Sequence, residues 1–185
     1  KIFGFSGWLM ASALFRNFAH SIDSLIMPRL MSISLLGAYN RPNGFISQIS
    51  SQFSGIFDSA LFPVLSEMQD NPEAIRRAYK KSLYYLNIFA MLLSLGFVFN
   101  SELLIRIFFG DQWLDLKFVF IILSLALVFN IDIRLTDCYL RSLALTRSQF
   151  FFSIVEFVLK IVCLVIGSFW GLVGFAFGGV LAVFV

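Results

Sequence analysis

Four polar residues near the start of the chain recur at the spacing of one helix face. They stand four, four and three residues apart and are Ser12, Arg16, His20 and Asp23. At about 100° per residue, these intervals place all four on one stripe of an α-helix. Such a stripe can line a cavity in which Arg16 binds an anionic or sugar-bearing substrate and His20 or Asp23 exchanges a proton. It can equally form a self-neutralising seam against a neighbouring helix, and the pattern leaves both possibilities open.

A second polar stripe lies between residues 130 and 141. Its members, at intervals of four, three and four residues, are Asn130, Arg134, Asp137 and Arg141. A second polar face of the same segment carries Asp132, Thr136 and Tyr139. Charged residues within a membrane usually face the bundle interior or water. Either this helix lines a cavity, or its end leaves the membrane on the cytoplasmic side.

Three further charges stand inside apolar stretches. Asp58 has no local partner, so its candidate partners are Arg16 or Arg134 from another helix. Glu156 and Lys160 are four residues apart, in the order that favours an ion pair along one helix. Six residues are therefore the candidates for a substrate or cavity site: Arg16, His20, Asp23, Asp58, Arg134 and Asp137.

The same residues predict no catalytic, metal or cofactor site. His20 has no Ser or Cys neighbour in a nucleophile motif, and no glycine-rich phosphate loop follows a strand. Cys138 and Cys163 lie in apolar runs without metal-ligand spacing, so they are predicted to be buried free thiols. We expect a protein that is not an enzyme, has no cofactor and binds no nucleic acid.

The elements that position these residues must be membrane helices. Hydrophobic residues make up 59% of the chain and charged residues only 14%, against about 45–50% and about 25% in soluble domains. A soluble core of 185 residues could not bury so much apolar surface. Lipid must cover the rest.

The sequence predicts an all-α, polytopic membrane helix bundle of about six transmembrane segments. A spanning helix needs about 20 mainly apolar residues, and the segments that meet this need are 3–27, 45–65, 83–100, 113–133, 149–169 and 172–185. Residues 37–44 are predicted to form a turn, and Asn71 and Pro72 to begin a helix as its N-cap and first residue. Because both ends of the chain lie in apolar segments, we expect it to be part of a longer protein.

Basic residues predict the orientation in the membrane. The connections between consecutive spans lie on alternate sides of the membrane, which places seven Lys and Arg residues on one side and four on the other. The cluster Arg76, Arg77, Lys80 and Lys81 carries most of this bias. Cytoplasmic loops are the richer in Lys and Arg, so the side of residues 66–82 is expected to be cytoplasmic.

Five short strings stand in a characteristic order: residues 36–41 (LGAYNR), 61–66 (LFPVLS), 76–79 (RRAY), 109–113 (FGDQW) and 171–176 (GLVGFA). Their order and spacing resemble the Wzx-type polysaccharide flippases of the multidrug/oligosaccharidyl-lipid/polysaccharide exporter superfamily. The positions that carry the resemblance are Gly37, Tyr39, Arg41, Pro63, Ser66, Gly110 and Trp113.

This resemblance implies a larger, two-lobed transporter in which the present chain forms part of the second lobe. It implies a multi-pass protein of the bacterial inner membrane that flips a lipid-linked oligosaccharide by alternating access, for O-antigen, capsule or exopolysaccharide synthesis. The expected partners are the lipid bilayer and the lipid-linked oligosaccharide, with H+ or Na+ as candidate coupling ions. Three alternatives stay open: a drug or small-molecule exporter of the same superfamily, a membrane polysaccharide polymerase, and a membrane scaffold with structural ion pairs.

Overall fold

The computed structural model describes the backbone of residues 2–30 and 32–184. It also describes their side chains, except those of residues 2–6, 8, 9, 16, 19, 20, 33, 54, 72, 183 and 184. All regular structure in this part of the chain is helical, as predicted. The α-helices are α1 (Ile2–Leu30), α2 (Ile33–Ile56), α3 (Phe62–Glu67), α4 (Pro72–Phe99), α5 (Ser101–Phe108), α6 (Lys117–Ser142), α7 (Thr146–Ser168) and α8 (Gly171–Phe184). The π-helical segment η1 (Phe57–Leu61) joins α2 to α3, and the 3₁₀ segment η2 (Asp111–Leu116) precedes α6.

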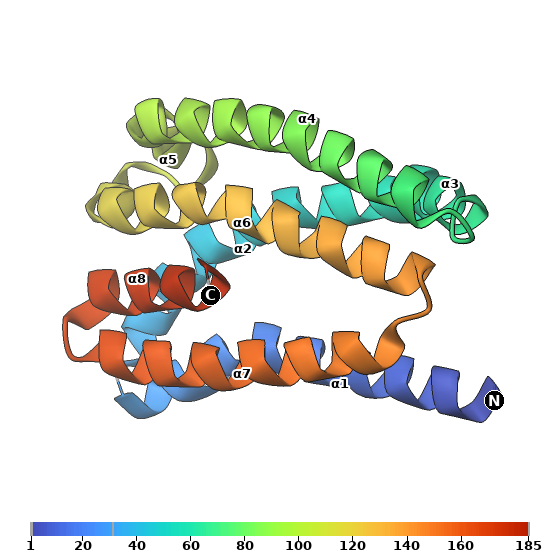
Figure 1. Ribbon diagram of the computed structural model, residues 1–185. Coiled ribbons are helices and arrows are strands. Elements are labelled where there is room, and N and C mark those ends of the chain that lie inside the picture. The colour runs from blue at the N-terminus through green and yellow to red at the C-terminus, as the bar shows by residue number, and fades with distance from the viewer. Residues whose placement is uncertain (1, 31, 185) are drawn as a thin grey trace.

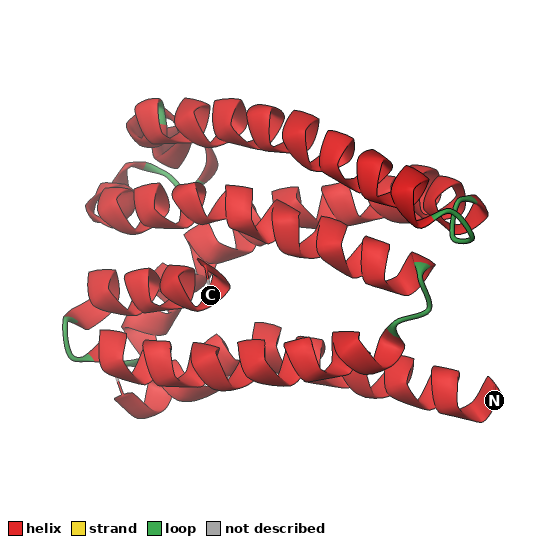
Figure 2. Cartoon of the chain, in the orientation of Figure 1, coloured by secondary structure: helices red, strands yellow, loops and turns green. Residues whose placement is uncertain are grey.

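The helices lie in two layers (Figure 1). One layer contains α1, α7 and α8, and the other contains α3, α4, α5 and α6, while α2 passes from one to the other. Within the layers α7 packs on α1 and α8, and α6 packs on α4. The helix α6 also contacts α2 and α8 and so holds the layers together. Short turns make the connections (Figure 2), and the prediction of an all-α helix bundle is confirmed.

Much of the bundle's outer surface is apolar. Three described stretches are long and apolar enough to cross a membrane by length and composition: Glu73–Phe99, Asp111–Ser142 and Thr146–Ser168. In the most apolar 18 residues of the first stretch, only 11% are buried within the bundle. A contiguous outward apolar surface of this kind requires a covering partner, which in a membrane is lipid or another apolar helix. The limits of the six predicted spans stay predictions.

The predicted turn at residues 37–44 is wrong, because these residues are helical and belong to the first half of α2. A buried stripe explains why the helix continues through Pro42; its members are Tyr39, Pro42, Ile46 and Ser50. They recur every three or four residues, and α2 packs on α6. Pro42 removes one backbone hydrogen bond, and the burial of this stripe outweighs that loss.

The predicted start of α4 is confirmed. Asn71 is the N-cap, and its side-chain oxygen accepts a hydrogen bond from the backbone N–H of Ala74 at 3.1 Å. Pro72 occupies the first turn, where its missing N–H costs nothing. The longest connection between described helices is residues 68–71, so this N-cap fixes where the chain re-enters the bundle.

Three of the family-motif positions join α2 to the start of α6. Gly110 has a φ of 93°, a conformation that glycine adopts without steric cost. The chain turns there between α5 and η2. Trp113, in η2, then lies beneath Arg41 of α2, whose Cζ atom is 4.6 Å from the centroid of the indole ring. The geometry is that of a cation–π contact.

Replacing Arg41 by glutamine is expected to lower the free energy of unfolding by about 0.5–1 kcal/mol, the usual worth of an exposed cation–π contact. Arg41→Lys keeps the charge and should cost less. The comparison is made by thermal unfolding of the protein in detergent. Equal stabilities for the wild type and Arg41→Gln would show that the contact contributes nothing.

Candidate functional site

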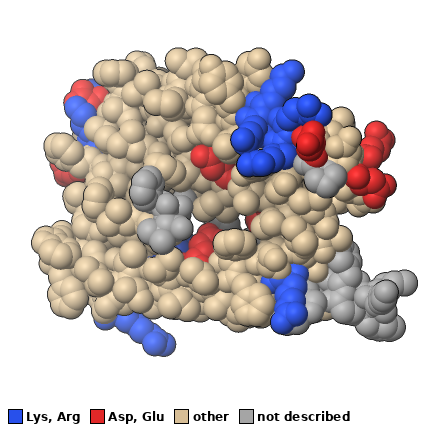
Figure 3. Space-filling view, in the orientation of Figure 1, with Lys and Arg blue, Asp and Glu red and all other residues tan. Residues whose placement is uncertain are grey.

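A polar cavity of about 410 Å³ opens between the two layers. It is lined from α1, α2, η1, α6, α7 and α8. The molecular surface is hollowed near the middle of the face shown in Figure 3, and acidic side chains lie beside the hollow. The polar lining residues are Asn17, Asp23, Tyr39, Asn43, Ser47, Ser50, Asp58, Asn130, Arg134, Asp137, Arg141, Glu156 and Lys160. Ligand pockets commonly enclose about 300–1,000 Å³, so the volume of this cavity is in the range of a small-ligand site.

A buried ionic centre forms part of the cavity wall. Lys160 Nζ of α7 lies 3.0 Å from Asp23 Oδ1 of α1, and only 14% and 5% of the two side chains are exposed. The Tyr39 hydroxyl of α2 donates a hydrogen bond to Asp23 Oδ2 at 3.4 Å. The Tyr39 ring meets Phe175 of α8 edge-on, with 5.3 Å between centroids. Three helices, α1, α2 and α7, therefore meet at the Asp23 carboxylate, and α8 packs against the Tyr39 ring.

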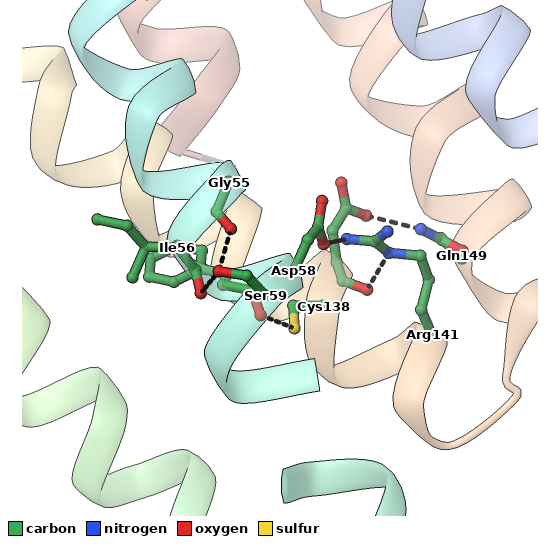
Figure 4. A network of polar contacts seen from close by, with 9 residues as sticks. Gly55, Ile56, Asp58, Ser59, Cys138, Arg141 and Gln149 are labelled. Carbon is green, nitrogen blue, oxygen red and sulfur yellow. Dashed lines mark hydrogen bonds and ion pairs between the residues drawn. The ribbon is translucent and has the colours of Figure 1, made fainter. Parts of the chain in front are cut away.

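A second polar group links η1, α6 and α7 (Figure 4). The Arg141 guanidinium forms an ion pair with Asp58, and its Nε donates to the backbone carbonyl of Asp137 at 3.4 Å. Gln149 Nε2 donates to Asp137 Oδ1 at 3.1 Å, so α7 is tied to α6. The Cys138 thiol donates to the Phe57 carbonyl at 3.6 Å. A π-helical turn often marks a functional position, and here it places Asp58 on the cavity wall.

The two polar faces of α6 have different surroundings. Asn130, Arg134, Asp137 and Arg141 all line the cavity, and Arg134 Nε donates to Ser50 Oγ of α2 at 2.9 Å. The other face is directed at α4. Asp132 accepts a hydrogen bond from Asn87 at 2.8 Å, and the hydroxyls of Thr136 and Tyr79 are 3.0 Å apart. One face contributes to the cavity, and the other joins two helices.

The structure brings together all the predicted site residues whose side chains it describes. Asp23, Asp58, Arg134 and Asp137 line the same cavity. The side chains of Arg16 and His20 lie outside the described part of the structure. The functional roles of all six stay predictions. The sequence offered Arg16 and Arg134 as candidate partners of Asp58, and the structure describes an ion pair of Asp58 with Arg141. For Lys160, the described partner Asp23 comes from another helix.

Sequence reasoning missed the α2 wall of the cavity. Its polar members recur at intervals of four, four and three residues and are Tyr39, Asn43, Ser47 and Ser50. These are the same intervals that identified the stripe in α1. The signal was present, but it was hidden because residues 37–44 contain glycine and proline and were predicted to be a turn.

The family-motif positions serve mainly the architecture. Tyr39 is buried at the cavity, and Gly37 is exposed on α2. In α3, Pro63 is exposed and Ser66 is partly buried. Arg41 and Trp113 form the contact described above and Gly110 forms a turn, so the motif positions are spread over α2, α3 and the approach to α6 and do not form one compact site.

The cavity lining carries both signs of charge. The described carboxylates are Asp23, Asp58, Asp137 and Glu156, and the described cations are Arg134, Arg141 and Lys160. Among the described residues no group of three His, Cys, Asp or Glu is arranged to hold a metal ion. Fold and site together define a class, a multi-pass helical membrane protein with a charged cavity inside its bundle.

The chain belongs to a family of polysaccharide biosynthesis proteins, whose family model matches residues 1–118. It is similar to a Klebsiella pneumoniae protein described as an uncharacterized membrane protein in the cps region, with 25% identity over 175 residues, covering 94% of this chain and 36% of that protein. It is also similar to the lipopolysaccharide biosynthesis protein WzxC of Escherichia coli K12, with 24% identity over 109 residues, covering 59% and 22%. The amylovoran biosynthesis protein AmsL of Erwinia amylovora is 24% identical over 152 residues, covering 80% and 38%. No solved structure matches the chain.

These relatives confirm the predicted membership of the polysaccharide flippase family. The chain spans less than two fifths of the length of each of these curated relatives. It is a multi-pass membrane protein of polysaccharide synthesis.

Proposed function

We propose that the chain is part of a transporter that flips a lipid-linked oligosaccharide across the bacterial inner membrane by alternating access. In this proposal it carries substrate and catalyses no covalent step. Two of the relatives are named for the biosynthesis of lipopolysaccharide and amylovoran, and we infer that a membrane-embedded member of this family moves a sugar unit across the bilayer. Rocking of one helical unit against another around a site near the bilayer centre is the general mechanism of such transporters.

The observation that carries the proposal is the polar cavity inside a bundle whose outer surface is largely apolar. Ionisable residues within a membrane cost about 2.5–3.5 kcal/mol each on insertion scales. Seven described ones line this single space, together with amides and hydroxyls such as Asn43, Ser47 and Asn130. A carbohydrate offers many hydroxyls to such groups, and guanidinium groups suit a diphosphate because they can bind two oxygens at once.

The size of the cavity agrees with a substrate site that is formed partly by this chain and partly by the rest of the full-length protein. A volume of about 410 Å³ holds only part of a lipid-linked oligosaccharide. The relatives are more than twice as long as the matched region. We therefore assign this cavity to one wall of a larger translocation path, and the rest of the full-length protein supplies the opposite wall.

The cavity also offers a place for a coupling ion. Asp23 is buried and is held by Lys160 and Tyr39 from two other helices. A proton or Na+ that reached this carboxylate would compete with the Lys160 ammonium and would loosen the contact between α1 and α7. His20 stands on the same sequence stripe and is the second candidate for this role.

Replacing Arg134 by alanine in the full-length protein is expected to reduce surface polysaccharide at least about tenfold. A hydrogen bond to a charged group contributes about 1.5–3 kcal/mol, and 1.4 kcal/mol corresponds to a factor of ten. Arg134→Lys keeps the charge but loses the fork geometry, so an intermediate level is expected. The amount of polysaccharide at the cell surface is measured at matched levels of membrane protein.

Arg29→Ala is the matched control, because Arg29 is exposed at the end of α1 and lies outside the cavity lining. Asp23→Asn tests the coupling step in the same assay, and its export should no longer respond to external pH or Na+. Normal export by Arg134→Ala would show that Arg134 and its cavity have a structural role and do not bind the substrate. A change in the efflux of small drugs with normal surface polysaccharide would favour the drug-exporter alternative.

A further inference from the structure

The first turns of α4 carry a patch of basic side chains that are not part of the cavity lining. The basic patch consists of Arg76, Arg77, Lys80 and Lys81, all of them exposed. Figure 3 shows Lys and Arg side chains gathered over this part of the molecule. No hydrogen bond or ion pair links any of the four side chains to another described residue. Their charges are therefore available to an external partner.

The patch includes a shallow depression. Arg76, Arg77 and Lys80 line a space of about 280 Å³ together with Glu73. The three cations that line this depression outnumber its one carboxylate, so the net charge of the site is positive. A depression with several donors and a net positive charge suits a phosphate group.

The exposed surface of α4 changes along its length from basic to aromatic and then to apolar. Tyr84 and Tyr85 follow the last two lysines of the basic patch by four residues each, and they are 64% and 60% exposed. Phe89 and Leu92 lie further toward the C-terminal end of α4, and they are 52% and 66% exposed. Tyrosine is enriched where a membrane helix meets the headgroups. The order of residue types follows the order of layers in a lipid bilayer.

The distances along the helix agree with this order. With a rise of 1.5 Å per residue, α4 extends about 22 Å from Tyr84 to Phe99, most of a hydrocarbon core of about 30 Å. The basic patch ends one helical turn before Tyr84, about 5 Å away along the axis. Its cations therefore lie at the depth of the headgroup phosphates when the apolar part of α4 is in the membrane.

We infer that the basic patch is a binding site for the phosphates of anionic phospholipids in the leaflet where α4 enters the membrane. Lysine and arginine stems can lie along apolar surface while their charged ends reach the phosphates. A juxtamembrane cation contributes about 1 kcal/mol to binding an anionic membrane surface. The outward apolar stripe that continues from the patch identifies the partner as lipid, because an acidic soluble protein would match only the charges.

The test compares lipid retention by the full-length protein in nanodiscs that contain equal amounts of phosphatidylglycerol and phosphatidylcholine. The wild type should retain phosphatidylglycerol preferentially when protein–lipid complexes are released and analysed by mass spectrometry. Arg76→Gln/Arg77→Gln removes two cations, each worth about fivefold, and should reduce this preference on the order of 25-fold. Arg76→Lys/Arg77→Lys keeps both charges and should preserve most of it.

Arg29→Gln/Arg106→Gln is the matched control, because it also removes two exposed arginines but leaves the basic patch intact. Its preference should equal that of the wild type. The inference is overturned if Arg76→Gln/Arg77→Gln retains the full preference, or if the control loses as much. Complete displacement of phosphatidylglycerol by millimolar inorganic phosphate would also overturn it, since the site would then select a free anion rather than a lipid.

Discussion

Replacing Lys160 by methionine is expected to lower the free energy of unfolding by about 3–5 kcal/mol, the usual cost of removing one partner of a buried ion pair. Lys160 Nζ and Asp23 Oδ1 are 3.0 Å apart, and both side chains are largely buried. Methionine keeps a flexible apolar side chain and removes the ammonium, so Asp23 must either stay charged in an apolar environment or take up a proton. Unfolding in mixed detergent micelles, followed by far-UV circular dichroism, gives the difference.

Lys117→Met is the matched control for this prediction. Lys117 and Glu102 form an ion pair of 2.6 Å that is 39% and 59% exposed, and exposed pairs contribute at most about 1 kcal/mol. Asp23→Asn/Lys160→Met removes both buried charges and should recover much of the lost stability. If Lys160→Met costs no more than Lys117→Met, the buried pair does not contribute to the folded bundle.

The part of the site that could be predicted from the sequence is the part that depends on helical periodicity alone. Charged residues at intervals of three and four mark one helix face wherever a helix forms. This rule selected Asp23 in α1 and both Arg134 and Asp137 in α6, which the structure places on one cavity. It did not require knowledge of which helices are neighbours.

Partners across helices could not be predicted in this way. Arg141 and Asp58 are 83 residues apart in the chain, and each has several possible partners of opposite charge. The choice depends on the crossing of η1 and α6 and on the π-helical turn that orients Asp58. Local spacing carries no information about either feature.

The error at residues 37–44 has a related cause. Local propensity predicts a turn there, since glycine and proline weaken an isolated helix. Burial of Tyr39 and Pro42 depends on the rest of the bundle. Tertiary packing decided the conformation, and the polar face of α2 became part of the cavity as a consequence.

Close packing of α7 on α8 depends on three glycines: Gly167, Gly174 and Gly178. A Cβ atom at Gly178 would collide with the backbone carbonyl of Cys163, and Cβ atoms at the other two would collide with each other's backbone. Small residues at such positions let membrane helices approach closely. The contact also positions the cavity, because α8 supplies Phe175 and Gly179 beside Tyr39.

Replacing Gly178 by alanine is therefore expected to lower the free energy of unfolding by about 1–3 kcal/mol, and Gly178→Leu by about 3 kcal/mol or more. The added atoms meet backbone, which cannot rotate away as a side chain can, so α7 and α8 must separate. Gly96→Ala in α4 is the control, because a Cβ atom there has no neighbour within 4 Å, and its higher helix propensity should raise stability by up to about 1 kcal/mol. Unfolding in detergent distinguishes the two. If Gly178→Ala is as stable as Gly96→Ala, then α7 and α8 are further apart in the folded protein, and Tyr39 is positioned on Asp23 by other contacts.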